Sequence, residues 1–99
     1  MKIKTKSLEN KRISILTNNL NVCVVCGKPK QHIHEIYFGK NRRNSMIYGF
    51  CIPLCLNCHN RIHNNIELDL KYKQLCQKEY EKDHTRDDFM NIIKRNYLQ

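Results

Sequence analysis

The sequence predicts a small α+β domain in which a four-cysteine zinc site braces two short strands, with C-terminal helices packed against them. The chain has 99 residues, no tryptophan and few other aromatic residues, so it can bury only a modest core. A chain of this size usually needs additional stabilisation, such as a structural metal ion. Two Cys-x-x-Cys pairs supply its ligands, and apolar residues at helical spacing occupy the last third of the chain.

We expect a single domain over residues 1–99, divided into a basic N-terminal segment at 1–20, a metal-binding core at 21–65 and C-terminal helices at 66–99. In the N-terminal segment Ser7 is placed to cap a short amphipathic element. The spacing of its apolar residues mixes the helical and strand periods, so the residues leave both structures open. These apolar residues are Leu8, Ile13, Ile15, Leu16 and Leu20.

The core should contain two strands and two metal-binding turns. "VCVVCGKP" predicts a tight knuckle closed by Gly27 and Pro29. The alternating "HIHEIYF" over 32–38 predicts a strand, and "RRNSMIYG" predicts a short helical turn ended by Gly49. "FCIPL" predicts a second strand, which Pro53 confines to a sheet edge or a strand end. After Cys58 the chain should become helical.

Two helices are predicted for the C-terminal part. From Ile66 to Lys82 a mostly apolar stripe recurs at helical spacing. Its members are Leu68, Tyr72, Leu75, Cys76, Glu79 and Tyr80. Thr85 followed by Asp88 resembles a capping box, which opens a last helix that buries Phe89, Ile92 and Ile93. Cys76 lies within the stripe, so we interpret it as a buried core thiol.

The positive charge lies mainly in the front half of the chain. The net charge is +9, and residues 1–43 hold ten Lys or Arg and two Glu, whereas 44–99 hold eight basic and seven acidic residues. Four zinc-bound thiolates would lower the net charge to about +7. This asymmetry favours the binding of a polyanion to the front half. The alternative is a basic surface that only keeps the protein soluble. No opening stretch resembles a signal peptide and no apolar run would span a bilayer, so we expect an intracellular protein with reduced cysteines and no membrane contact.

The two cysteine pairs predict a structural zinc site. Cys23 and Cys26 form one knuckle and Cys55 and Cys58 the other, and two such knuckles complete a tetrahedral site. A finger-like site using Cys55, Cys58 and His63 would leave the first pair unused. "CLNCH" also matches a haem-attachment motif, but such attachment normally requires export. Cys51 is then left as a small apolar packing residue.

Two histidines follow the second knuckle immediately. On a helix, His59 and His63 would project from one face about one turn apart, as two ligands of a single metal do. The alternative is a pair of surface histidines on a polar helix. A metalloprotease is excluded because Asn60 stands where its motif requires a glutamate general base.

These motifs together resemble the HNH, or ββα-metal, nuclease family. "HIHEIYFGKNRRNSMIYGFCIPLCLNCHNRIH" is similar to the phage-encoded branch with a Gly-x-Asn-Arg segment, a Ser-x-x-Tyr-Gly turn and a Leu-Cys ending followed by two histidines. The resemblance covers residues 23–65 and extends weakly to "KRNYL" near the end. It implies a β-hairpin and a helix that clasp one divalent cation at the scissile phosphate, braced by a zinc ribbon.

The resemblance also implies roles for individual residues. Cys23, Cys26, Cys55 and Cys58 would hold structural Zn²⁺, and His59 and His63 would hold the catalytic cation, Mg²⁺ or another divalent metal. His34 would be the general base, for which a neutral imidazole is well suited. A group of basic side chains would neutralise flanking phosphates of the DNA. These are Lys28, Lys30, Lys40, Arg42 and Arg43.

The chain departs from the family pattern at two places. Ile33 stands where a metal-binding residue usually precedes the base, so either Glu35 is the third ligand or Glu35 and His34 exchange tasks, with His32 in reserve on the same strand face as His34. The middle Asn of the family name is also missing before the second knuckle. Asn41 and Asn44, earlier in the chain, are candidates to replace it.

The favoured hypothesis is a metal-dependent DNA endonuclease acting on duplex or branched DNA inside the bacterial host of a phage or prophage, in recombination or packaging. A homodimer is an option because double-strand cleavage by a one-site enzyme needs two copies. The alternative is a non-catalytic zinc-ribbon module that binds nucleic acid or a protein. A redox-sensing zinc switch using Cys51 is a third hypothesis.

Overall fold

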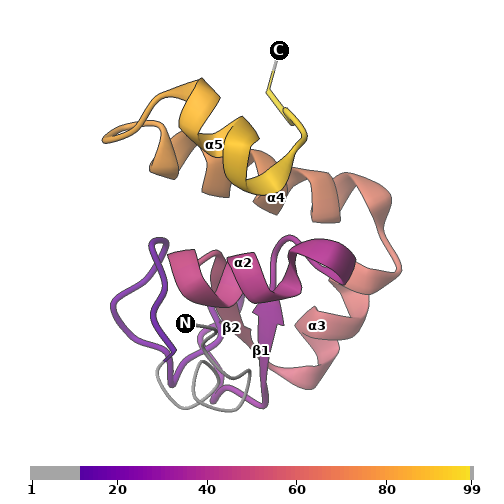
Figure 1. Cartoon of the computed structure of the whole chain (residues 1–99). Helices are drawn as coiled ribbons and strands as arrows, with labels where there is room; N and C mark the ends of the chain where they lie inside the picture. Colours follow the sequence, from indigo (N-terminus) through magenta and orange to yellow (C-terminus); the bar gives the residue numbers. More distant parts are fainter. Residues whose placement is uncertain (1–11, 99) are drawn as a thin grey trace.

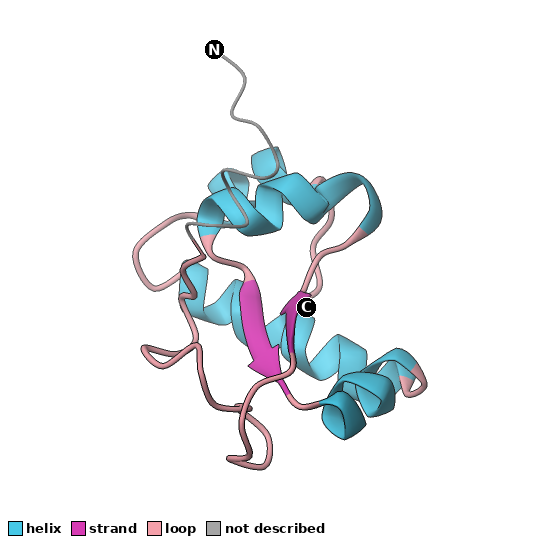
Figure 2. Ribbon diagram, turned by 90° about the horizontal axis from the view of Figure 1, so that it is seen from below, coloured by secondary structure: helices cyan, strands magenta, loops and turns pink. Residues whose placement is uncertain are grey.

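A two-stranded antiparallel sheet and the helix that follows it form the centre of the fold (Figures 1 and 2). The structure is a computed structural model that describes residues 12–98. Strand β1 (His32–Glu35) is followed by a 3-10 turn η1 (Gly39–Asn41), helix α2 (Arg42–Tyr48), strand β2 (Cys51–Leu54) and helix α3 (Leu56–His63). Helices α4 (Ile66–Tyr80) and α5 (Arg86–Ile93) complete the described chain and lie together above α2 in Figure 1. The prediction of a small α+β fold is confirmed.

The register of the sheet fixes which side chains of β1 share a face. His32 pairs with Leu54 and His34 with Ile52, so these two histidines lie on the same side of the strand. Strand β1 is shorter than the predicted 32–38 because it ends at Glu35. Ile36 and Tyr37, next in sequence, are both buried, so the alternation between an inner and an outer face stops there.

The turn from α2 into β2 is built around Gly49. Its φ of 74° lies in the left-handed region, which ends the helix as predicted. A Cβ atom at Gly49 would lie 3.2 Å from Cγ1 of Ile13, because residues 13–15 run alongside this turn. The Ile15 amide donates to the Gly49 carbonyl at 2.9 Å. No helix or strand forms in the described part of the N-terminal segment, 12–20, while Ser7 and Leu8 lie outside the described residues.

The C-terminal helices cover one side of the core. Cys76 of α4 is buried, as predicted, and Tyr80 is buried as well, whereas Leu75 of the same stripe is 41% exposed. Helix α4 also ends at Tyr80 rather than at residue 82. The capping box of α5 is confirmed: Thr85 accepts from the Asp88 amide and Asp88 accepts from the Thr85 amide. Both helices close over one core cluster shared with the sheet and α3, whose aromatic members are Tyr37, Phe50, Tyr80 and Phe89.

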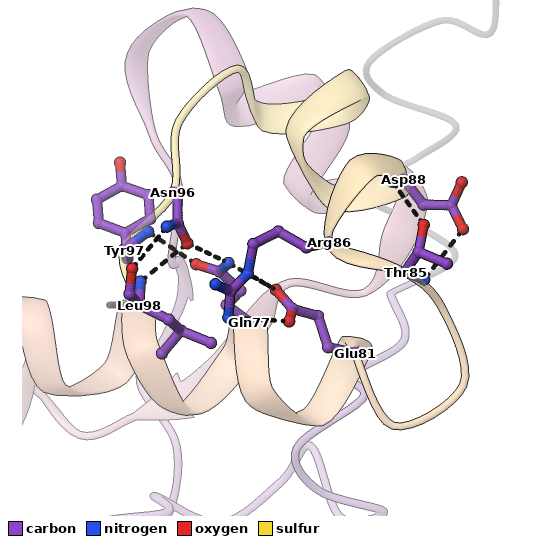
Figure 3. A network of polar contacts seen from close by, with 8 residues as sticks. All are labelled: Gln77, Glu81, Thr85, Arg86, Asp88, Asn96, Tyr97 and Leu98. Atoms are coloured by element: carbon purple, nitrogen blue, oxygen red, sulfur yellow. Dashed lines mark hydrogen bonds and ion pairs between the residues drawn. The ribbon is translucent and has the colours of Figure 1, made fainter.

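A buried glutamine fastens the C-terminal segment to α4 (Figure 3). The Gln77 side chain is fully buried; its Nε2 donates to Oδ1 of Asn96 at 2.8 Å and to Oε2 of Glu81 at 2.6 Å. Its Oε1 accepts from the Tyr97 amide at 2.8 Å. The nitrogen and the oxygen of this side-chain amide are therefore both hydrogen-bonded.

Replacing Gln77 by alanine should lower the free energy of unfolding by about 1–3 kcal/mol, because buried partners lose their hydrogen bonds. The measurement is urea denaturation followed by circular dichroism. Lys78→Ala, at the next and exposed position of the same helix, is the matched control and should change the stability little. Equal stabilities of the two variants would contradict a fastening role for Gln77.

Candidate metal centres

Four cysteine sulfurs meet where the first knuckle approaches the start of α3. The Sγ atoms of Cys23, Cys26, Cys55 and Cys58 lie within 4.8 Å of one another, and none of these cysteines forms a disulfide. The first pair sits on a turn in which the Gly27 amide donates to the Cys23 carbonyl at 3.0 Å and Gly27 takes a φ of 79°. In the second pair, Cys55 is the N-cap of α3 and its Sγ accepts from the Cys58 amide at 3.5 Å. Four cysteines in this arrangement can bind one metal ion such as zinc.

The protonation of these sulfurs is uneven in the metal-free chain. Burial alone would raise the pKa of Cys23, but hydrogen bonds from neighbouring backbone groups, first among them that of Cys55, lower it to about 6. Burial and hydrogen bonding to the other cysteine sulfurs raise the pKa of Cys58 to about 12. Binding of a cation would displace the protons that remain on these thiols.

The cysteine group ties the elements of the core to one another. The Val24 amide donates to the Pro53 carbonyl at 3.1 Å, which joins the first knuckle to β2. The side chain of Gln31, just before β1, accepts from the Leu56 amide at 2.8 Å at the start of α3. A metal held by these cysteines would therefore fix the position of α3 relative to both strands.

Cys51 and Cys76 stay outside this group. The Cys51 thiol donates to the Ile13 carbonyl at 2.9 Å, and burial raises its pKa to about 11. Burial also raises the pKa of Cys76. Both thiols are fully buried and neither belongs to the four-cysteine group, so they behave as core side chains.

A second group of ligand atoms is formed by three histidines. One ring nitrogen from each of His34, His59 and His63 lies within 4.8 Å of the others. Helix α3 begins at Leu56, earlier than predicted, and this brings His59 and His63 to successive turns with their Nε2 atoms 2.9 Å apart. His34 reaches them from β1; its ring centroid lies 5.3 Å from that of His59 and 5.4 Å from that of His63.

The environment of this group lowers the pKa of two of its imidazoles. Burial, and then the neighbouring His59 and His63, lower the pKa of His34 from 6.5 to about 4. Burial followed by His63 and His32 also lowers the pKa of His59. Neutral imidazoles offer lone pairs to a metal without first losing a proton. A cation at their centre could accept one lone pair from each of the three rings.

The donor set decides which cation fits. Three imidazoles suit first-row transition metals, whereas Mg²⁺ prefers oxygen ligands in octahedral geometry. In the part of the chain that the structure describes, no carboxylate belongs to the group. The residues therefore fit a divalent transition metal better than the Mg²⁺ expected from the resemblance.

Glu35 lies apart from the three histidines. It alternates with His34 along β1, and its carboxylate forms ion pairs with Arg12 and, at 3.8 Å, with Nε of Arg42. His32 instead shares the face of His34, with its ring centroid 5.0 Å from that of His59. The structure therefore places His32, the reserve candidate, beside the three histidines, whereas Glu35 is not part of their group.

The two asparagines proposed to replace the missing middle Asn have another partner. The Asn41 amide donates to the Ile93 carbonyl at 3.0 Å, and that of Asn44 donates to the Ile92 carbonyl at 3.1 Å. Both side chains thus satisfy carbonyls at the C-terminal end of α5. Their contacts in the structure hold α2 to α5.

The basic residues assigned to DNA binding fall on two segments. Lys28 and Lys30 are exposed on the first knuckle, before β1, and Lys40 is exposed on η1, with Arg42 and Arg43 half-buried at the start of α2. These segments flank β1 in sequence on either side of His34. The contact of these basic side chains with phosphates stays a prediction.

Sequence reasoning missed the residues next to His63. Phe38 is half-exposed just after β1, and its ring centroid lies 6.3 Å from that of His63. Lys73 Nζ sits 4.5 Å from the centre of the Phe38 ring and 2.8 Å from Oδ2 of Asp69. The i, i+4 spacing of Asp69 and Lys73 was a visible signal, but their approach to residue 38 depends on how α4 packs.

Comparison with protein-family models, with curated proteins and with solved structures finds no match for this chain. Across residues 12–98, none of the helices combines the length and the apolar character needed to cross a membrane.

Proposed function

We propose that this chain is a metal-dependent DNA endonuclease of the HNH, or ββα-metal, type, which hydrolyses phosphodiester bonds. The observation that carries the proposal is the convergence of His34 from β1 with His59 and His63 from α3, next to the four-cysteine group. A binding module would need the cysteines to hold its shape but has no need of three ligating imidazoles on one face.

In this proposal zinc is held by the four cysteines and a second cation by the three histidines. A divalent cation at the histidines supplies Lewis-acid stabilisation of the charge that develops on the phosphate and the leaving oxygen. The burial of His34 at 3% exposure and its place among the three imidazoles favour a ligand role over the base role that the resemblance suggests. His34 supplies a ring nitrogen and holds the strand against α3.

A proton acceptor for the attacking water is then needed on β1. His32 is exposed on the same face as His34, so its imidazole can take up a proton in contact with solvent. The carboxylate of Glu35 is already engaged by Arg12 and Arg42 on the other side of the strand. We therefore assign the proton transfer to His32 and retain Glu35 as the competing candidate.

DNA fits the charge of the chain. A net charge of +9, concentrated before residue 44, attracts the phosphate backbone, and each neutralised phosphate releases counterions. Binding should therefore weaken steeply as salt rises. Replacing Lys40 or Arg43 should reduce the salt dependence by about one counterion each.

The cation preference tests this proposal. We expect zinc-loaded protein to nick supercoiled plasmid with Mn²⁺, Co²⁺ or Ni²⁺ and to do so much more slowly with Mg²⁺, because the donors are imidazoles. EDTA should stop the reaction while the cysteine-bound zinc is retained. The rates are measured by gel at matched metal concentrations, and a clear advantage for Mg²⁺ would contradict the three-histidine assignment.

A second function is favoured by one observation. Asn41 and Asn44 bind α5, so the described chain offers neither of them to orient a catalytic base. A non-catalytic zinc-ribbon module would bind DNA in a salt-dependent way but leave every phosphodiester bond intact. Binding without cleavage under all four cations would favour this function.

A further inference from the structure

A small cavity adjoins the histidine group. Its volume is about 200 Å³, and its lining residues are Phe38, Ile62, His63, Ile66 and Asp69. His63 therefore belongs both to the cavity wall and to the three-histidine group. Whatever occupies the cavity would lie directly next to a phosphate held at the histidines.

Phe38 presents an aromatic surface at this cavity. Its side chain is 50% exposed, and its ring centroid is 6.4 Å from that of His34. Lys73 Nζ lies over the ring at 4.5 Å from its centre, and Asp69 holds that ammonium group through a 2.8 Å ion pair. The ring is thus supported on one side by a fixed cation and remains half-open to solvent.

Ile66 adds an apolar side to the same cavity. It is 87% exposed at the first position of α4, where burial against the core does not explain an isoleucine. An exposed aromatic ring and an exposed aliphatic side chain beside a cation site form a surface suited to a flat, partly apolar group attached to a phosphate. A nucleobase is such a group.

We propose that Phe38 stacks on an unpaired nucleobase next to the scissile phosphate, so that the chain prefers DNA with an unpaired nucleotide at the cut over an intact duplex. This inference rests on the proposed nuclease function. Bases of an intact duplex are already stacked on their neighbours, so using Phe38 would require unstacking, whereas an unpaired base is available at little cost. Phe38 is then a specificity-determining residue, and Lys73 positions its ring.

Cleavage kinetics test the preference. The substrates are a duplex and the same duplex with one unpaired nucleotide at a defined place, cut by zinc-loaded full-length protein with Mn²⁺. We expect the ratio of kcat/KM for the unpaired over the paired substrate to fall about 5-fold to 150-fold in Phe38→Leu, as loss of one base–aromatic stack implies. Phe38→Tyr keeps the ring and should keep the ratio.

Leu75→Ala is the matched control, because Leu75 is similarly exposed on α4 but lines a different cavity. Its ratio should equal that of the unchanged protein. A protein that cuts both substrates equally, or a Phe38→Leu ratio equal to that of the unchanged protein, would overturn the inference while leaving the nuclease function in place.

A fluorescence measurement separates this inference from the function on which it rests. Oligonucleotides carrying 2-aminopurine at the unpaired position are titrated with the unchanged protein. The protein carries its cysteine-bound zinc, and no second cation is added. Stacking on Phe38 should quench the fluorescence, and Phe38→Leu should not. Quenching by a protein that cuts no DNA once Mn²⁺ is added would support the stacking surface and remove the nuclease function; binding without quenching would overturn the stacking surface itself.

Discussion

Replacing Cys58 by serine should abolish zinc binding and leave most of the chain unfolded at 25 °C. The four cysteines join the first knuckle to the start of α3, and Cys58 is 5% exposed among them. Apparent binding free energies of structural zinc are about 10–16 kcal/mol in small domains. The whole stability of a domain is about 5–15 kcal/mol, so loss of the metal exceeds what the core can replace.

The matched control for this variant is Cys51→Ser. Cys51 is also buried, but it donates to the Ile13 carbonyl, and a hydroxyl can make the same hydrogen bond. The zinc content per chain and the far-ultraviolet circular dichroism are measured for both variants. One zinc per chain and a native spectrum are expected for Cys51→Ser; the same result for Cys58→Ser would sink the four-cysteine assignment.

Replacing His34 by alanine should weaken binding of the second cation more than about 100-fold and reduce cleavage in proportion. Loss of a residue that merely supports a metal ligand typically costs about 10–100-fold in affinity or activity, so loss of a ligand should exceed that range. Cation affinity is measured by calorimetry with Mn²⁺ on zinc-loaded protein. A thermal melt of each sample checks that the buried position tolerates the change.

His32→Ala separates the ligand from the proton acceptor. We expect it to bind Mn²⁺ nearly as well as the unchanged protein but to cut DNA about 10²–10⁴-fold more slowly, the usual contribution of a general base. Glu35→Gln is assayed beside it and should retain both cation binding and most of the rate. If His34→Ala keeps its cation affinity while losing the rate, His34 is the base, as the resemblance alone suggests.

Local patterns were sufficient for the features that neighbouring residues determine. The Cys-x-x-Cys pairs, the capping box at Thr85 and the left-handed Gly49 each depend on a few consecutive positions, and the structure has all of them. The pairing of His59 with His63 followed from helical spacing in the same way. These features need no knowledge of distant contacts.

The remaining features depend on contacts across the chain. Strand β1 stops at Glu35 because Ile36 and Tyr37 both enter the core, which alternation within 32–38 does not reveal. The partner of Glu35 is Arg12, 23 positions earlier, and Asn44 bonds to a carbonyl 48 positions later. Such separations are set by tertiary packing, so sequence spacing could not assign these roles.

In the proposed function, the chain holds a second cation with three histidines and uses it to cut DNA. The most direct test compares zinc-loaded unchanged protein with the His59→Ala/His63→Ala double variant on supercoiled plasmid, with Mn²⁺ and with EDTA. Nicking only by the unchanged protein, and only with Mn²⁺, is the result we expect. Equal nicking by the double variant, or none by a folded, zinc-loaded and Mn²⁺-saturated unchanged protein, would contradict this function.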